Sequence, residues 1–128
     1  MSAEKNVILT SDQILQKTKR IAYQIYESNS SEESIVIAGI AENGYIFASQ
    51  IAKFLEEISP LKINMCKVII NKKNPLQSIQ TSIDSSEYQN KSLVLVDDVL
   101  NSGRTMMYSL NSFLKNPVKS ISIAVLVD

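Results

Sequence analysis

The stretch from Leu93 to Thr105 constrains this chain more than any other. It reads Leu-Val-Leu-Val-Asp-Asp-Val-Leu-Asn-Ser-Gly-Arg-Thr, in which four apolar residues run directly into two adjacent carboxylates. An unbroken apolar run is typical of a strand that is buried on both faces of a parallel sheet. Open α/β sheets bind ligands outside the carboxyl ends of their strands. We therefore expect Asp97 and Asp98 at such an end, where they face a ligand, a metal ion or both.

The residues after the carboxylates predict an anion site. Gly103 permits backbone conformations and a close approach to a ligand that other residues resist. A helix is expected to begin near Thr105, and its N-terminus offers unpaired N–H groups to an anion. Ser102 adds a hydroxyl and Arg104 adds a positive charge. The combination suits a sugar phosphate; the plain alternative is a turn that ends in a helix cap.

This stretch resembles the signature of the type I phosphoribosyltransferases, and most closely that of the pyrimidine-operon regulators that double as uracil phosphoribosyltransferases. The shared run is Asp-Asp-Val-Leu-x-Thr/Ser-Gly-Arg-Thr. The resemblance implies binding of 5-phosphoribosyl-1-pyrophosphate. By position, Asp97 and Asp98 would hold the ribose hydroxyls, directly or through Mg²⁺, and would be the catalytic residues. The residues around the 5′-phosphate would be Asn101, Ser102, Gly103, Arg104 and Thr105.

The resemblance also assigns a pyrophosphate loop to Gly39–Gly44. In the resembled regulators this loop typically reads Gly-Ile-Lys-Thr-Arg-Gly, whereas this chain has Ala41 and Asn43 at the two basic positions and carries Glu42 between them. The backbone N–H groups of this loop, including that of Gly44, remain available as hydrogen-bond donors. Each charge-assisted hydrogen bond contributes about 1.5–3 kcal/mol, so the loss of two weakens affinity about a hundredfold or more. A plain strand-to-helix turn is the alternative interpretation.

The rest of the chain predicts one α/β domain over residues 1–128, with a mainly parallel, Rossmann-like sheet flanked by helices. Thr10 and Gln13 form a capping box for the first helix. Ile46 is expected to pack inward from the second helix, and Met106, Met107, Leu110, Phe113 and Leu114 from the third. The polar segment 71–90 falls where the family has its flexible loop. The expected helices are 11–27, 45–58 and 105–114, and the expected strands are 35–38, 63–70, 93–96 and 120–127.

Composition excludes several chemistries. The chain has no His and one Cys, so the usual zinc ligand sets and His-dependent nucleophilic catalysis cannot be assembled. Cys66, among apolar neighbours, is expected to be buried and unreactive. Mg²⁺, held by carboxylates and phosphate oxygens, is the remaining metal and the expected cofactor. The longest apolar runs are too short to span a membrane, which favours a cytoplasmic protein.

Partners can also be anticipated. Thirteen basic and thirteen acidic residues cancel, so no global charge favours nucleic acid. The cluster of Lys17, Lys19 and Arg20 is interpreted as a solvated helix face, and no RNA partner is expected. Members of the resembled family continue beyond the last strand into a hood over the base. We expect this hood segment to be absent after Asp128, so that the site is either open or completed by another subunit. A homodimer is the expected assembly.

The sequence leaves three functions open. The first is a Mg²⁺-dependent phosphoribosyltransferase that displaces pyrophosphate by a nucleobase. A pyrimidine is favoured because Asn101 stands where hypoxanthine-guanine enzymes carry an Asp. The second is a non-catalytic domain of the same type that binds a phosphoribosyl ligand or nucleotide as a regulatory or interaction module. The third is an unrelated α/β phosphoryl-transfer or receiver-like domain that uses Asp97 and Asp98 to hold Mg²⁺. It is disfavoured because receivers usually carry the acid pair after their first strand.

Overall fold

A computed structural model describes residues 10–70, 80–99 and 104–127 of the chain. They form a five-stranded sheet in the order β3-β2-β1-β4-β5. All neighbouring strands are parallel except the short β3, which is antiparallel to β2. In chain order the elements are α1 (Ser11–Ser28), β1 (Ser34–Ile40), α2 (Ala41–Ile58), β2 (Lys62–Ile69), β3 (Gln80–Thr81), α3 (Ser85–Tyr88), β4 (Ser92–Val99), α4 (Arg104–Leu114) and β5 (Ser120–Val127).

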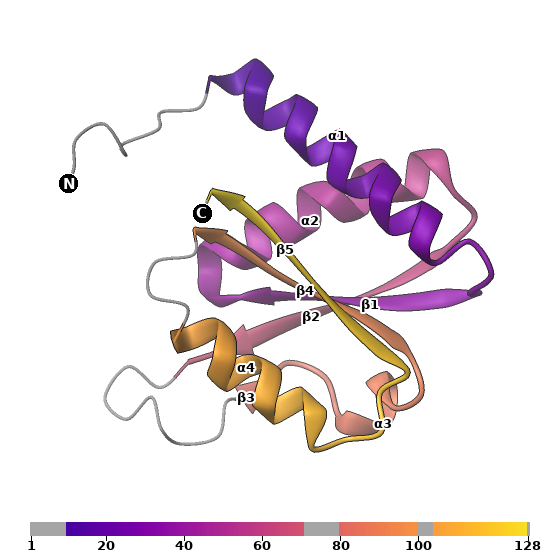
Figure 1. The fold of residues 1–128 in the computed structure, drawn as a ribbon, viewed down its shortest axis with the longest axis vertical. Helices are drawn as coiled ribbons and strands as arrows, with labels where there is room; N and C mark the ends of the chain where they lie inside the picture. The colour runs from indigo at the N-terminus through magenta and orange to yellow at the C-terminus, as the bar shows by residue number, and fades with distance from the viewer. Residues whose placement is uncertain (1–9, 71–79, 100–103, 128) are drawn as a thin grey trace.

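Helices cover both faces of this sheet, as the sequence predicted (Figure 1). α1 and α2 pack on one face over residues such as Ile37 and Val96. α3 and α4 lie on the other face, where Tyr88 and Phe113 meet edge to face with ring centroids 5.2 Å apart. The central strands β1 and β4 supply alternate residues to both cores, which explains their unbroken apolar runs.

The start of α1 confirms the predicted capping box. The Thr10 backbone N–H donates to Gln13 Oε1 at 2.9 Å, and the Gln13 N–H donates to Thr10 Oγ1 at 3.1 Å. Both bonds satisfy donors that a helix otherwise leaves unpaired at its first turn. The buried stripe of α1 also follows the prediction, with Thr18, Ile21, Ala22 and Ile25. None of the helices within the described ranges is long and apolar enough to cross a membrane.

Three predicted core residues are instead exposed. Ile46, Met107 and Leu114 have 54%, 54% and 58% of their surface accessible. α2 buries one side, whose residues recur at helical spacing: Gly44, Phe47, Ala48, Ile51, Ala52 and Leu55. Ile46 does not lie on that side of the helix. α4 buries Met106 and Phe113, and the positions one residue later point away from that side. Hydrophobic character alone was therefore a poor guide to the buried face of these helices.

The polar segment 71–90 is more ordered than the sequence indicated. Its last part forms β3 and α3, and α3 is closed at its start by a capping box between Asp84 and Glu87. Tyr88 anchors α3 in the core. Residues 71–79, on which the flexible-loop prediction mainly falls, lie outside the described residues. β2 lies near the edge of the sheet and Cys66 is fully buried, as predicted.

Candidate active site

Predicted ligand residues lie at the end of the sheet where the parallel strands have their carboxyl ends. The four parallel strands all end there, and α2 and α4 begin there (Figure 1). The pairing of β1 with β4 stops at Gly39 and Val96, so Asp97 and Asp98 lie beyond the paired part of the β1–β4 ladder. On the other side β4 stays paired with β5, with Asp97 opposite Val125. The acid pair is thus carried on the last residues of a strand, as the sequence predicted, and the strand extends one residue beyond Asp98.

The two carboxylates of the pair interact closely. The Asp98 backbone N–H donates to Asp97 Oδ1 at 2.9 Å, and both residues are partly buried. Burial, together with a hydrogen bond to the Asp98 side chain, raises the pKa of Asp97 to about 6. Two carboxylates that share a partly desolvated site favour a proton or a cation between them. The pair is therefore suited to hold a divalent cation or to accept a proton near neutral pH.

The first turn of α2 packs directly against this pair. A Cβ added at Gly44 would lie 3.0 Å from the Val96 carbonyl oxygen and 3.4 Å from Asp97 Oδ1. One at Gly39 would lie 2.4 Å from Tyr45 Cα, a distance that backbone atoms cannot accommodate. The two glycines therefore let β1, α2 and β4 meet. The structure brings together the two segments that the sequence assigned to pyrophosphate and ribose.

The predicted pyrophosphate loop differs in form from the expectation. Residues 41–44 are not a loop but the first turn of α2, which begins four residues earlier than predicted. The N-cap residue Ile40 makes no side-chain hydrogen bond to this turn, and Ala41 adopts a left-handed backbone with φ of 57°. A helix N-terminus without a side-chain cap leaves N–H groups that an anion can accept from. Ala41, Glu42 and Asn43 are exposed there.

The predicted phosphate loop is only partly described. α4 begins at Arg104, so the expected helix start near Thr105 is confirmed. The side chain of Thr105 is partly buried in the first turn of α4. Asn101, Ser102 and Gly103 lie outside the described residues, and the phosphate contacts assigned to them and to Arg104 stay predictions.

Lys67 is a candidate site residue that the sequence did not indicate. It lies near the carboxyl end of β2, opposite Gly39 across the β1–β2 ladder. Its Nζ forms an ion pair with Glu42 and lies 6.0 Å from the centre of the Tyr45 ring. The available signal was a charged residue followed and preceded by apolar ones near the end of the strand, between Cys66 and Val68. Glu42 is therefore not an isolated anion beside the proposed pyrophosphate site, since Lys67 neutralises it.

The residues present fit a magnesium ion that arrives with phosphate oxygens. Within the described ranges no three His, Cys, Asp or Glu side chains gather to hold a metal by themselves. Asp97 and Asp98 supply a hard oxygen pair. Mg²⁺ is commonly bound through one or two carboxylates, water and substrate phosphates rather than by an all-protein cage.

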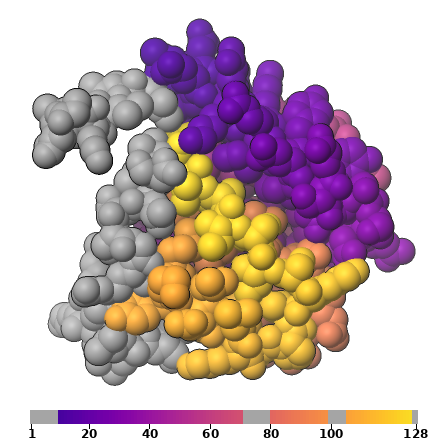
Figure 2. Space-filling view, in the orientation of Figure 1, coloured from indigo at the N-terminus to yellow at the C-terminus, as the bar shows by residue number. Residues whose placement is uncertain are grey.

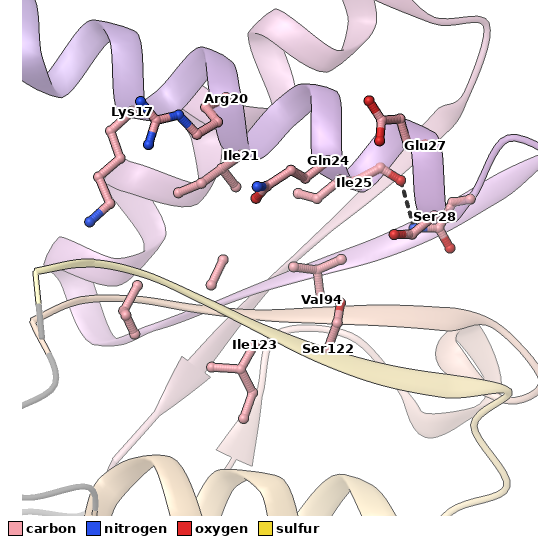
Figure 3. A pocket seen from close by; sticks show the side chains of 13 residues that line it. Lys17, Arg20, Ile21, Gln24, Ile25, Glu27, Ser28, Val94, Ser122 and Ile123 are labelled. Carbon is pink, nitrogen blue, oxygen red and sulfur yellow. Dashed lines mark hydrogen bonds between the residues drawn. The ribbon is translucent and has the colours of Figure 1, made fainter.

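An open groove of about 690 Å³ lies elsewhere, between α1 and the strands β4 and β5 (Figure 3). Lys17 and Arg20 from α1 and Ser122 and Ala124 from β5 are among the residues that line it. β5 is an edge strand and lies on the surface between α1 and α4 in Figure 2. The acid pair does not line this groove. The chemistry that the carboxylates can perform therefore belongs to the strand ends and not to this groove.

Comparison with known proteins agrees with the geometry. The phosphoribosyl transferase domain family matches residues 6–128. The chain belongs to this phosphoribosyltransferase family. The bifunctional protein PyrR of Clostridium novyi is 33% identical, over 97% of this chain and 74% of its own length. PyrR of Clostridioides difficile is 34% identical, over 98% of this chain and 75% of its own.

Solved structures show the same phosphoribosyltransferase fold. A hypoxanthine-guanine phosphoribosyltransferase from Bacillus anthracis superposes with a TM-score of 0.72 and 18% identity, covering 94% of this chain and 72% of its own. A hypoxanthine phosphoribosyltransferase from Staphylococcus aureus also gives a TM-score of 0.72, with 23% identity. At these identities the likeness concerns the fold alone. The resemblance that residues 93–105 indicated is confirmed.

Proposed function

We propose that this phosphoribosyltransferase domain binds 5-phosphoribosyl-1-pyrophosphate with Mg²⁺ and transfers the phosphoribosyl group to a nucleobase. The observation that carries the proposal is the contact between the acid pair and α2. Asp97 lies against Gly44 in a helix turn whose N–H groups have no side-chain cap. Oxygen ligands for a ribose or a cation and donors for an anion thus lie side by side.

The residues of the chain would act mainly by positioning and by charge. A nitrogen of the base bonds to C1 of the ribose while the bond from C1 to the pyrophosphate oxygen breaks, and pyrophosphate leaves with the electron pair. The Asp97 and Asp98 carboxylates would orient the ribose and stabilise positive charge as it develops on the sugar. A carboxylate whose pKa is about 6 can also accept the proton that the base nitrogen loses. Mg²⁺ would neutralise charge on the leaving pyrophosphate.

A pyrimidine is the proposed acceptor. Asn101 carries an amide at a position where a carboxylate would be needed to take a proton from a purine of the hypoxanthine-guanine type. An amide cannot accept that proton. The similarity to PyrR proteins points to the same branch of the family.

A non-catalytic binding module is the second candidate. Glu42 places a carboxylate in the helix turn where pyrophosphate would bind, and Ala41 and Asn43 provide no positive charge. Such a turn favours retention of a ribose 5-phosphate end over productive binding of pyrophosphate. The domain would then sense a phosphoribosyl ligand or nucleotide without turnover.

Calorimetry followed by an activity assay separates the two. Ribose 5-phosphate and phosphoribosyl pyrophosphate are each titrated with Mg²⁺, and pyrophosphate release is then measured with uracil, cytosine, hypoxanthine and guanine. We expect both ligands to bind and uracil to release pyrophosphate. Binding of both without release by any base would support the second candidate, and no binding of either would contradict both.

Assembly and location remain predictions. A homodimer was expected from the resemblance, and sedimentation equilibrium of the chain would test it. An RNA partner is not expected from the charge balance. A cytoplasmic location is likewise the expectation, and fractionation of cells would check it.

A further inference from the structure

The Glu42–Lys67 ion pair lies at the side of the site opposite to α4. β1 separates β2 from β4, so the strand that carries Lys67 is two strand spacings, roughly 10 Å, from the strand that carries Asp97. α4, at whose N-terminus the resemblance places the 5′-phosphate, follows β4. A ribose at the acid pair would therefore have one anionic end toward α4 and the other toward Lys67.

The position of Lys67 is fixed by its backbone. Its N–H donates to Ser82 Oγ at 2.8 Å, and its carbonyl accepts from the Ser82 N–H at 3.0 Å. The neighbours Cys66 and Val68 point into the α3–α4 core, while Met65 packs on the side of α2. Alternation along the strand places Lys67 on the α2 side as well. Its ammonium group thus reaches the first turn of α2 from a rigid strand.

The pair faces water and can exchange partners. The Lys67 side chain is 31% exposed and that of Glu42 is 74% exposed. An ion pair of this kind contributes little to stability, because water solvates both charges well when it opens. A diphosphate offers Lys67 several anionic oxygens at once and gains the free N–H groups of the helix turn, so it competes well with one carboxylate.

We infer that Lys67 is the cation that recognises the diphosphate end of the ligand, and that Glu42 occupies it until a diphosphate takes its place. The inference rests on the proposed function and names the specificity residue of that site. Lys67 replaces, from a neighbouring strand, the positive charge that residues 41–44 lack. Glu42 then makes the site selective for highly charged ligands, because a ligand with little negative charge cannot displace the Glu42 carboxylate from Lys67.

The test is calorimetry of the full chain with magnesium pyrophosphate and, separately, with ribose 5-phosphate. Lys67→Met keeps the apolar stem and should weaken pyrophosphate binding about tenfold or more, the size expected for a charge-assisted contact. Lys67→Arg should retain most of the affinity. Glu42→Gln should strengthen pyrophosphate binding about threefold or more by freeing Lys67. Ribose 5-phosphate affinity should change less than about twofold in all three.

Glu32 and Lys119 provide a matched control. They form a similar ion pair at the amino ends of β1 and β5, far from the strand ends that carry the site. Glu32→Gln and Lys119→Met should leave both affinities unchanged.

Three results would overturn the inference: pyrophosphate affinity unchanged in Lys67→Met, weaker pyrophosphate binding in Glu42→Gln, or no measurable pyrophosphate binding by the unaltered chain. Failure of ribose 5-phosphate to bind would instead contradict the proposed function. The pyrophosphate titration therefore tests the inference, and the ribose 5-phosphate titration tests the proposed function. Because Glu42 is exposed, we expect the Glu42→Gln variant to fold. Its pyrophosphate titration therefore tests the inference even where a Lys67 variant is unstable.

Discussion

Asp97 and Asp98 are the residues on which the proposed chemistry depends. Replacing both with Asn keeps their size while removing the charge that would hold the ribose hydroxyls or Mg²⁺. We expect Asp97→Asn with Asp98→Asn to abolish ribose 5-phosphate binding in calorimetry, a loss of about a hundredfold or more. The circular dichroism spectrum should not change.

Glu56 and Glu57 offer a matched control for that double variant. They are also adjacent carboxylates, exposed in the last turn of α2. Changing both to Gln should leave ligand binding as it was. Normal ribose 5-phosphate affinity in the Asp97–Asp98 double variant would refute the site assignment.

Asp97 should also make the stability of the protein depend on pH. Its pKa is raised from 3.8 to about 6 by burial and by the neighbouring Asp98, so the folded state holds the proton more tightly than the unfolded chain does. The stability contribution of this proton is present below pH 3.8 and is lost as the pH rises toward 6. Because Asp97 is partly exposed, we expect the loss to be about 1 kcal/mol.

Urea unfolding at pH 4 and pH 7.5 measures this effect. Asp97→Asn has no such proton to lose, so it should be more stable than the unaltered chain at pH 7.5. That advantage should shrink at pH 4. An advantage of equal size at both pH values would show that Asp97 has an ordinary pKa.

At the scale of the elements, the contact between β1 and α2 depends on Gly39. An alanine Cβ there would lie 2.4 Å from Tyr45 Cα and 2.7 Å from the Gly44 carbonyl oxygen, and backbone atoms cannot move aside cheaply. We expect Gly39→Ala to lower the free energy of unfolding by about 3 kcal/mol, as overpacking at a rigid contact does. Chemical denaturation would measure it.

Gly44→Ala is the informative comparison. Its Cβ would meet the Val96 carbonyl at 3.0 Å and Asp97 Oδ1 at 3.4 Å, so a smaller shift accommodates it. We expect less destabilisation than in Gly39→Ala, together with weaker ribose 5-phosphate binding because Asp97 is displaced. Equal destabilisation by both changes would contradict this account of the β1–α2 junction.

At the scale of the whole molecule, β1 and β4 couple the two cores. Alternate residues of each strand point to opposite faces, so Ile51 from α2 and Phe113 from α4 pack against the same two strands from either side. We expect Ile51→Ala to cost about 2–5 kcal/mol and Phe113→Ala about 3–5 kcal/mol. Each should shift one cooperative transition, seen alike by circular dichroism and tyrosine fluorescence, and two separate transitions would contradict the coupling.

The sequence by itself determined the class of fold and the place of the acid pair. An apolar run ending in Asp97 and Asp98 is a local pattern, and its short length and β-branched residues are typical of a strand buried on both faces. The strand at 120–127 and the start of α1 followed from equally local signals, the apolar run and the capping box. Such features need no knowledge of what packs against them.

Only the tertiary structure decided how the site is charged. Lys67 and Glu42 are 25 residues apart, and the β1–β2 register that places Lys67 opposite Gly39 is what brings them together. The same holds for the first turn of α2, which the sequence described as a loop because no cap signal marks its start. Strand register and close backbone contact arise from packing between distant segments, and no pattern within one segment specifies them.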